Sequence, residues 1–129
     1  MILDADRRHL AKEGLNYLEA TEAGFQCIVL QSFTLPPGFD PGRADMLLRL
    51  PPGFPDAAPD MWWCDPPVRV AATGKFPVAA EVMEPHLGRT WQRFSRHLRP
   101  GQWKPGNSGL ATFLAIIRQD LAKTVGTTL

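Results

Sequence analysis

The stretch LPPGFPDAAPDMWW, Leu50–Trp63, joins two strand-like runs through a proline-rich turn. The run Asp45–Leu50 stops at three turn residues, Pro51, Pro52 and Gly53, and the run Met61–Cys64 begins soon after the last proline of the stretch. Proline lacks a backbone N–H and fixes φ, so clustered prolines end a strand and hold a turn. A short connection between two extended runs favours their antiparallel pairing.

Upstream of this turn, the sequence predicts one helix and two more strands. Asp4 is placed to cap a short helix over Ala5–Glu13, which Gly14 ends. A weak extended run, Asn16–Thr21, follows, and then a stronger run, Phe25–Leu35, rich in β-branched and aromatic residues.

Downstream, residues 65–90 contain prolines and glycine that predict a loop, with one or two helical turns over Val78–Met83. A last helix is indicated by an apolar stripe, with Asn107 or Ser108 as its cap and Gly126 as its end. The stripe consists of Leu110, Phe113, Leu114, Ile117 and Leu121. The predicted fold class is α+β, a four-stranded antiparallel meander packed against helices in one domain over residues 1–129.

The composition of the chain bears on which partners and which cellular location we expect. The chain has 129 residues, 44% hydrophobic and 21% charged, with a net charge of +1. This charge gives no electrostatic reason to expect nucleic acid or an anionic membrane as a partner. No apolar run is long enough to span a bilayer, and the start of the chain does not look like a signal peptide, so we expect a cytoplasmic location.

The two cysteines, Cys27 and Cys64, lie in strand-like runs without C-x-x-C spacing or a nearby histidine. We therefore expect two small buried hydrophobic side chains, with no disulfide and no metal site. No motif for a cofactor is found either.

The proline turn resembles that of the ubiquitin-conjugating-enzyme (UBC) family, in which an aromatic-Pro-x-x-Pro-Pro turn links the third and fourth strands. Phe54, Pro55 and Pro59 match this pattern, whereas Ala58 replaces a proline. The segment WKPGNSGLATFLAII, which begins at Trp103, is similar to the Trp-x-Pro entry into the family's next helix. The resemblance covers roughly residues 5–124 and is strongest to divergent bacterial proteins encoded beside ubiquitin-like proteins and their activating enzymes.

The resemblance also identifies the position of the family's catalytic cysteine, eight residues before this tryptophan. Here that position is Ser95, and no cysteine follows Cys64. The family's His-Pro-Asn motif is replaced by EPHLG, in which Pro85 and His86 are reversed and no asparagine occurs. That asparagine supplies an oxyanion-stabilising amide in the family, so its absence puts the family's usual catalysis in doubt.

A serine hydroxyl needs a base to act as a nucleophile, and its ester is less reactive than a thioester. In an extended segment Ser95 and His97 point to the same side, so His97 is the first candidate base and His86 the second. The candidate catalytic residues are therefore Ser95, His97 and His86. The alternative is structural: Ser95 bonds backbone in a turn, His97 donates to a carbonyl, and His86 and His9 lie at the surface.

Candidate partner-binding residues fall in two groups. Arg93 and Arg96, with Arg99 nearby, suit an acidic or carboxylate-terminated partner, and Trp91 and Trp103 are candidate anchors of the core or of a groove. On the first helix, the resemblance implies that an activating enzyme docks at Arg7, Arg8 and Lys12. Trp62 and Trp63 face opposite ways in a strand, so one is expected in the core and the other against a helix or exposed as a possible contact for a protein partner.

Two functions follow from this reasoning. The first is a UBC-like component of a bacterial ubiquitin-like conjugation pathway, which works with an activating enzyme on the C-terminal tail of a ubiquitin-like protein and either carries the tail on Ser95 or orients it without a covalent bond. The second is a catalytically inactive adaptor that binds a ubiquitin-like protein or peptide. A third reading is an unrelated α+β domain whose proline turn matches by chance.

Overall fold

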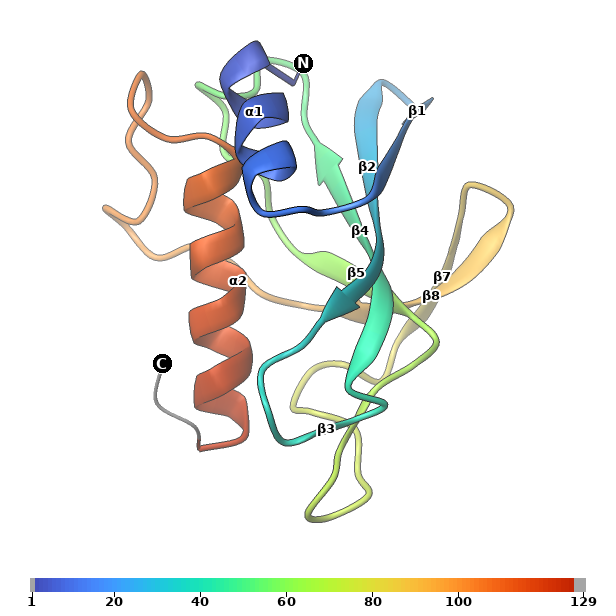
Figure 1. The fold of residues 1–129 in the computed structure, drawn as a ribbon. Coiled ribbons are helices and arrows are strands. Elements are labelled where there is room, and N and C mark those ends of the chain that lie inside the picture. The colour runs from blue at the N-terminus through green and yellow to red at the C-terminus, as the bar shows by residue number, and fades with distance from the viewer. Residues whose placement is uncertain (1, 127–129) are drawn as a thin grey trace.

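The computed structural model describes residues 2–126, in which two helices pack on one face of a curled antiparallel sheet (Figure 1). In chain order the elements are α1 (Asp4–Lys12), β1 (Tyr17–Glu22), β2 (Phe25–Thr34), β3 (Phe39–Asp40), β4 (Arg43–Leu50), β5 (Trp62–Asp65), β6 (Arg69–Val70), β7 (Met83–His86), β8 (Arg89–Phe94) and α2 (Leu110–Thr124). The main sheet has six strands in the order β1-β2-β4-β5-β8-β7, and β3 pairs with β6 separately. None of the described helices is long and apolar enough to cross a membrane.

The predicted α+β class is confirmed, but the predicted sheet is too small. The four expected strands correspond to β1, β2, β4 and β5, which lie side by side and antiparallel. The sheet then continues, because β8 pairs with β5 and β7 pairs with β8. It therefore has six strands instead of four.

Residues 65–90, where Pro66, Pro67 and Gly74 predict a loop, also contain β7 and the start of β8. Pro85 fits in β7 because this strand is at the edge of the sheet and has a neighbour on one side only. The hairpin turns through Leu87 and Gly88, whose φ values are +54° and +74°. Two consecutive residues with positive φ form the kind of tight turn that suits the twist of a hairpin.

A buried glutamine fixes the segment between β5 and β7. The Gln92 side chain accepts a hydrogen bond from the Val68 N–H (2.8 Å) and donates to the carbonyls of Val68 and Ala80 (both 3.0 Å). The helical turns predicted over Val78–Met83 are therefore wrong. The Ala80 carbonyl, which a helix would use internally, accepts from Gln92 instead, and Met83 already belongs to β7.

The two predicted helices are confirmed, the first within one residue of its expected bounds, Ala5–Glu13. Gly126, with φ of +74°, follows α2 as expected. The predicted caps are wrong: Asp4 is already helical, and neither Asn107 nor Ser108 caps α2. The reason is a different side chain that holds the starts of both helices.

That side chain is Asp6, which is buried between the helices. Its Oδ2 accepts a hydrogen bond from the N–H of Leu3 and its Oδ1 accepts one from the N–H of Leu110, each at 3.0 Å. Residue 109 is glycine because a Cβ there would lie 2.8 Å from Asp6 Oδ1. One carboxylate thus accepts a hydrogen bond from a backbone N–H at the start of each helix, and so it links α1 to α2.

The core has two parts, one on each face of the sheet. Trp62 is 1% exposed and packs with Phe94 and Phe113 on the face that the helices cover. Trp63 is 5% exposed and belongs to a second cluster on the opposite face. The prediction of opposite orientations is confirmed, but Trp63 is neither exposed nor part of a cluster with a helix, so both predicted alternatives for the second tryptophan are wrong. Both cysteines are buried and free, as predicted.

We expect Asp6→Ala to lower the free energy of unfolding by about 2 kcal/mol, because the N–H groups of Leu3 and Leu110 lose their acceptor. Urea unfolding followed by circular dichroism measures the change. Asp4→Ala is the matched control, since the Asp4 side chain is exposed and, among residues 2–126, pairs only with Arg7, at 3.5 Å. It should cost less than about 1 kcal/mol. Equal losses in the two variants would contradict the role given to Asp6.

Candidate functional site

Ser95 lies where the chain leaves β8 and turns toward α2. Its N–H donates to the carbonyl of Ala79 (3.0 Å), and its half-buried hydroxyl oxygen accepts a hydrogen bond from Arg93 Nε (2.9 Å). An arginine cannot take a proton from a serine, because the guanidinium is always charged and has no acceptor. The contact with Arg93 therefore positions Ser95 without activating it.

His97 does not pair with Ser95 within the described residues. Its side chain is 71% exposed, and its Nδ1 lies 2.7 Å from Asp60 Oδ2. Arg96, between the two residues, is held by Asp120 and by the carbonyl of Val78. The structure thus directs the imidazole of His97 toward Asp60 and provides Ser95 with no hydrogen bond to a base.

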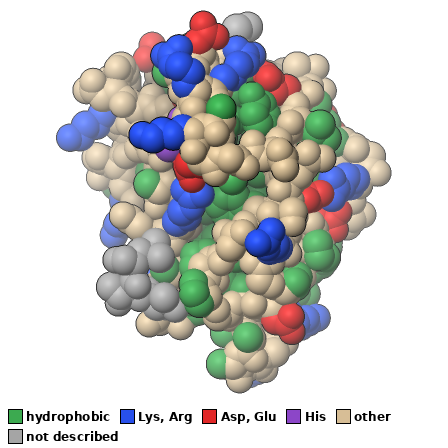
Figure 2. Space-filling model, viewed as in Figure 1, with side chains coloured by type: hydrophobic (Ala, Val, Ile, Leu, Met, Phe, Trp, Pro, Cys, Tyr) green, Lys and Arg blue, Asp and Glu red, His purple; other side chains and the backbone are tan. Residues whose placement is uncertain are grey.

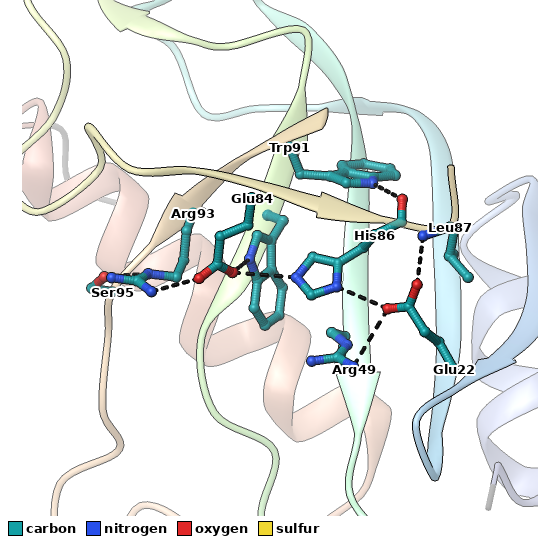
Figure 3. Close-up of polar contacts among 9 residues, drawn as sticks. Glu22, Arg49, Glu84, His86, Leu87, Trp91, Arg93 and Ser95 are labelled. Atoms are coloured by element: carbon teal, nitrogen blue, oxygen red, sulfur yellow. Dashed lines mark hydrogen bonds and ion pairs between the residues drawn. The ribbon is translucent and has the colours of Figure 1, made fainter. Parts of the chain in front are cut away.

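His86 lies between two carboxylates on the face of the sheet away from the helices (Figure 3). Its Nδ1 is 2.8 Å from Glu22 Oε1, and its Nε2 is 3.2 Å from Glu84 Oε1. Both ring nitrogens can donate to these oxygens only when the ring is protonated. The side chain is 13% exposed, so the expectation of a surface histidine is wrong.

A continuous set of polar contacts connects Ser95 to His86 (Figure 3). Arg93 bonds Ser95 through Nε and Glu84 through Nη1, at 2.9 and 2.6 Å, and Glu84 in turn contacts His86. We call Ser95, Arg93, Glu84, His86 and Glu22 the Ser95–Glu22 network. Ser95 and His86, which were both predicted as candidate catalytic residues, are therefore linked, but through Arg93 and Glu84 and not directly.

Sequence reasoning missed both carboxylates of this network. Glu84 had a signal, because it lies two residues before His86, and such residues share a face of a strand. Glu22 had none, because it is on β1, at the opposite edge of the sheet from β7. The sheet curls until these edges meet, and Glu22 Oε2 also accepts the N–H of Leu87 at 2.7 Å.

Hydrogen-bond donors around Glu22 and Glu84 lower the pKa of both carboxyl groups. The hydrogen bond from the Leu87 N–H lowers the pKa of Glu22, and contact with His86 adds to the effect. Burial alone would raise the pKa of Glu84, but hydrogen bonds from Trp63, His86 and Arg93 outweigh it and the net pKa is lowered. Both side chains are thus held in the charged form.

No thiol belongs to this site. Cys64 is completely buried in β5, and burial raises its thiol pKa far above the usual value. Burial also raises the pKa of Cys27, in β2. A thiolate is the reactive form of cysteine, so neither residue is suited to carry an acyl group. Within residues 2–126, no group of three or more His, Cys, Asp or Glu side chains is arranged to hold a metal ion.

The predicted partner-binding residues differ in how far they are exposed and in whether they are already paired. Trp91 is 0% exposed and donates to the carbonyl of His86 (2.9 Å), so it cannot contact a partner in this conformation. Trp103 is half-buried and donates to the carbonyl of Pro55 (2.7 Å), and thereby ties the proline turn to the segment before α2. Arg93 and Arg96 are both engaged in ion pairs.

On α1, Arg7 pairs with Glu19 (3.1 Å), whereas Arg8 and Lys12 are exposed and form no salt bridge within the described residues. On the face drawn in Figure 2, basic and acidic side chains are interspersed around this helix. Two cations of α1 are therefore available to a partner.

We expect the Ser95–Glu22 network to make stability depend on pH. Because Glu22 and Glu84 have lower pKa values when folded, they bind protons more readily when unfolded. Their contribution is complete above the unfolded pKa, about 4.3, and is lost as pH falls through the folded values. Urea unfolding from about pH 6 down to about pH 3 measures this loss.

Glu22→Gln should make this pH profile flatter, because the amide has no proton to bind. Glu81→Gln is the matched control, since Glu81 is exposed and forms no ion pair within the described residues. It should retain the wild-type slope. If Glu22→Gln and Glu81→Gln give the same slope as the wild type, the network does not contribute in this way.

Comparison with known proteins agrees with this geometry. The model of a family described as prokaryotic E2 family E matches residues 2–124, nearly the whole chain. Searches of curated proteins and of solved structures find no match. The structure has an antiparallel sheet covered by helices on one face, and its proline turn is bonded to the tryptophan before α2. The chain that adopts this fold belongs to prokaryotic E2 family E.

Proposed function

We propose that the protein is a cytoplasmic component of a bacterial ubiquitin-like conjugation pathway with a UBC-like fold. In this proposal it acts with an activating enzyme on the C-terminal tail of a ubiquitin-like protein, and its partners are proteins and not nucleic acid or membrane. Membership of prokaryotic E2 family E supports the pathway. The agreement of the first four sheet strands with the order that the resemblance implied supports the fold.

We further propose that the protein binds the tail without carrying it. The observation behind this form is the lack of an activated nucleophile: both thiols are buried in strands, and the hydroxyl of Ser95 contacts Arg93, which cannot act as a base. The hydroxyl can still donate its own hydrogen to a carbonyl oxygen of a bound tail. Ser95 then orients the tail, and Arg93 holds Ser95 in place.

A carrier role is the second candidate, favoured by the position of Ser95 at the exit of β8. In that case Ser95 Oγ attacks the activated carbonyl carbon of the tail, the new C–O bond forms, and the C–S bond to the activating enzyme breaks. The hydroxyl proton ends on the departing thiolate. His97 or His86 would assist, and each would first have to leave its carboxylate partner, Asp60 or Glu22 and Glu84.

A single assay separates these forms. The protein is mixed with ATP, a ubiquitin-like protein and the activating enzyme of that protein from the same genome, and the products are run on a gel without reductant. We expect binding of the ubiquitin-like protein without an adduct. An adduct cleaved by hydroxide but not by thiols, and lost in Ser95→Ala, would show instead that Ser95 is the carrier.

Two variants complete the assay. Ser108→Ala is the matched control, because Ser108 is a loop serine before α2 whose hydroxyl accepts the Lys104 N–H at 3.0 Å. Ser95→Cys tests whether the tail reaches this position, since a thiol there should form a thiol-sensitive adduct. Absence of both binding and adduct with all variants would contradict the proposed function.

The proposed docking of the activating enzyme makes a separate prediction. Reversing the charges of Arg8 and Lys12, both to Glu, should weaken binding to that enzyme by about tenfold, because two exposed cations of α1 are replaced by anions. Lys75→Glu paired with Arg43→Glu is the control with the same charge change away from α1. Titration calorimetry at low and high salt measures both. Equal loss in the two double variants would point to net charge and not to α1.

A further inference from the structure

A cavity of about 290 Å³ lies between the segment of residues 96–102 and the second half of α2. It begins one residue after Ser95, and its walls come from three parts of the chain: this segment, Trp62 of β5 and the exposed side of α2. The cavity is separate from the Ser95–Glu22 network, none of whose residues lines it. Nothing described so far accounts for it.

The charges that line this cavity are predominantly positive. Arg96, Arg99, Lys123 and His97 face one carboxylate, Asp120, and that carboxylate is already paired with Arg96 at 2.9 Å. Arg99 and Lys123 have no ion pair within residues 2–126. Two cations that line one cavity from different segments, neither of them in an ion pair within the described residues, favour an anionic ligand.

The cavity is also preformed. The N–H of Arg99 donates to Gln102 Oε1 (2.6 Å) and the N–H of Gln102 donates to the Arg99 carbonyl (3.1 Å), so a closed turn presents Arg99. Arg96 is fixed by Asp120 and by the Val78 carbonyl. A ligand would therefore bind with little ordering of this wall, which favours affinity.

Apolar and amide groups complete the wall. Trp62 lines the cavity from β5 and is 1% exposed. Its indole Nε1–H has no hydrogen-bond partner within the described residues, but it is covered by protein and is not a contact for a ligand in this conformation. Leu98 and Ile116 add apolar wall, and Gln119 adds an amide. Cations, an amide and apolar surface together suit a peptide better than a bare inorganic anion.

We propose that this cavity binds the free C-terminal carboxylate of an extended peptide, with Arg99 and Lys123 pairing with the carboxylate. The inference deepens the proposed function and rests on it only in naming the tail of a ubiquitin-like protein as the natural ligand. Arg96, which lines the cavity, follows Ser95 directly in the chain, whereas the Ser95 hydroxyl contacts Arg93 and does not line the cavity. A free carboxylate in the cavity is the non-covalent form of binding, in which no acyl bond is made.

The experiment uses the full chain and the peptide acetyl-Ala-Gly-Gly, with either a free carboxylate or a C-terminal amide. Small residues are chosen because the cavity is small. Binding is measured by ¹H–¹⁵N NMR, with the indole signal of Trp62 assigned through Trp62→Phe. We expect the acid to bind at least about tenfold more tightly than the amide, and to shift the Trp62 indole signal, because Trp62 lines the cavity.

Variants locate the site. Arg99→Ala with Lys123→Ala should weaken binding of the acid by about tenfold or more, whereas Arg43→Ala with Lys75→Ala removes the same charge elsewhere and should leave it unchanged. Gln119→Trp, on the exposed side of α2, should block the cavity without changing any charge. Inorganic phosphate should compete only weakly.

The proposal is overturned if the acid and the amide bind equally, if the Trp62 signal does not respond, or if phosphate competes as well as the peptide, which would mean a general anion site. These failures differ from failure of the proposed function. A ubiquitin-like protein that still binds the full chain, while the peptide ignores the cavity, would leave the pathway role intact and place the tail elsewhere.

Discussion

The carboxylate of Glu22 accepts one hydrogen bond from the backbone N–H of Leu87 and faces the ring of His86, and so it joins β1 to the end of β7. These strands are at opposite edges, and they meet only because the sheet curls. The curl encloses the second cluster around Trp63 and Trp91 on a face that no helix covers (Figure 1). The polar contacts that lead from there to Ser95 depend on this closure.

The chemistry of the candidate site follows from what each side chain already contacts. Both carboxylates of the network are held in the charged form, and Arg93 stands between them and Ser95. A charged, fully paired set of groups is suited to fixing a loop in one position, and less suited to moving a proton. These contacts favour the proposed binding of a tail over nucleophilic attack by Ser95, and a preformed cationic cavity begins one residue after Ser95.

Two buried side chains, Gln92 and Asp6, and the half-buried Trp103 hold the segments around the site in position. Gln92 holds the segment before β7 through three hydrogen bonds, Asp6 holds the starts of both helices, and Trp103 bonds the proline turn. Each of these side chains meets backbone groups far away in sequence. Their burial makes them sensitive points, because a lost partner would leave a backbone N–H or carbonyl unsatisfied.

The sequence by itself determined the local elements: strands bounded by proline and glycine, the apolar stripe of α2, and the placement of Trp62 and Trp63 on opposite faces. These depend on periodicity and backbone preference, which act over a few residues. Only the tertiary structure decided that Asp6 and not Asp4 is the cap, that Pro85 lies in an edge strand, and that Ser95 connects to Glu22 and not to His97. Such contacts depend on how far the sheet curls and on which groups distant in sequence meet. A local sequence pattern does not contain this information.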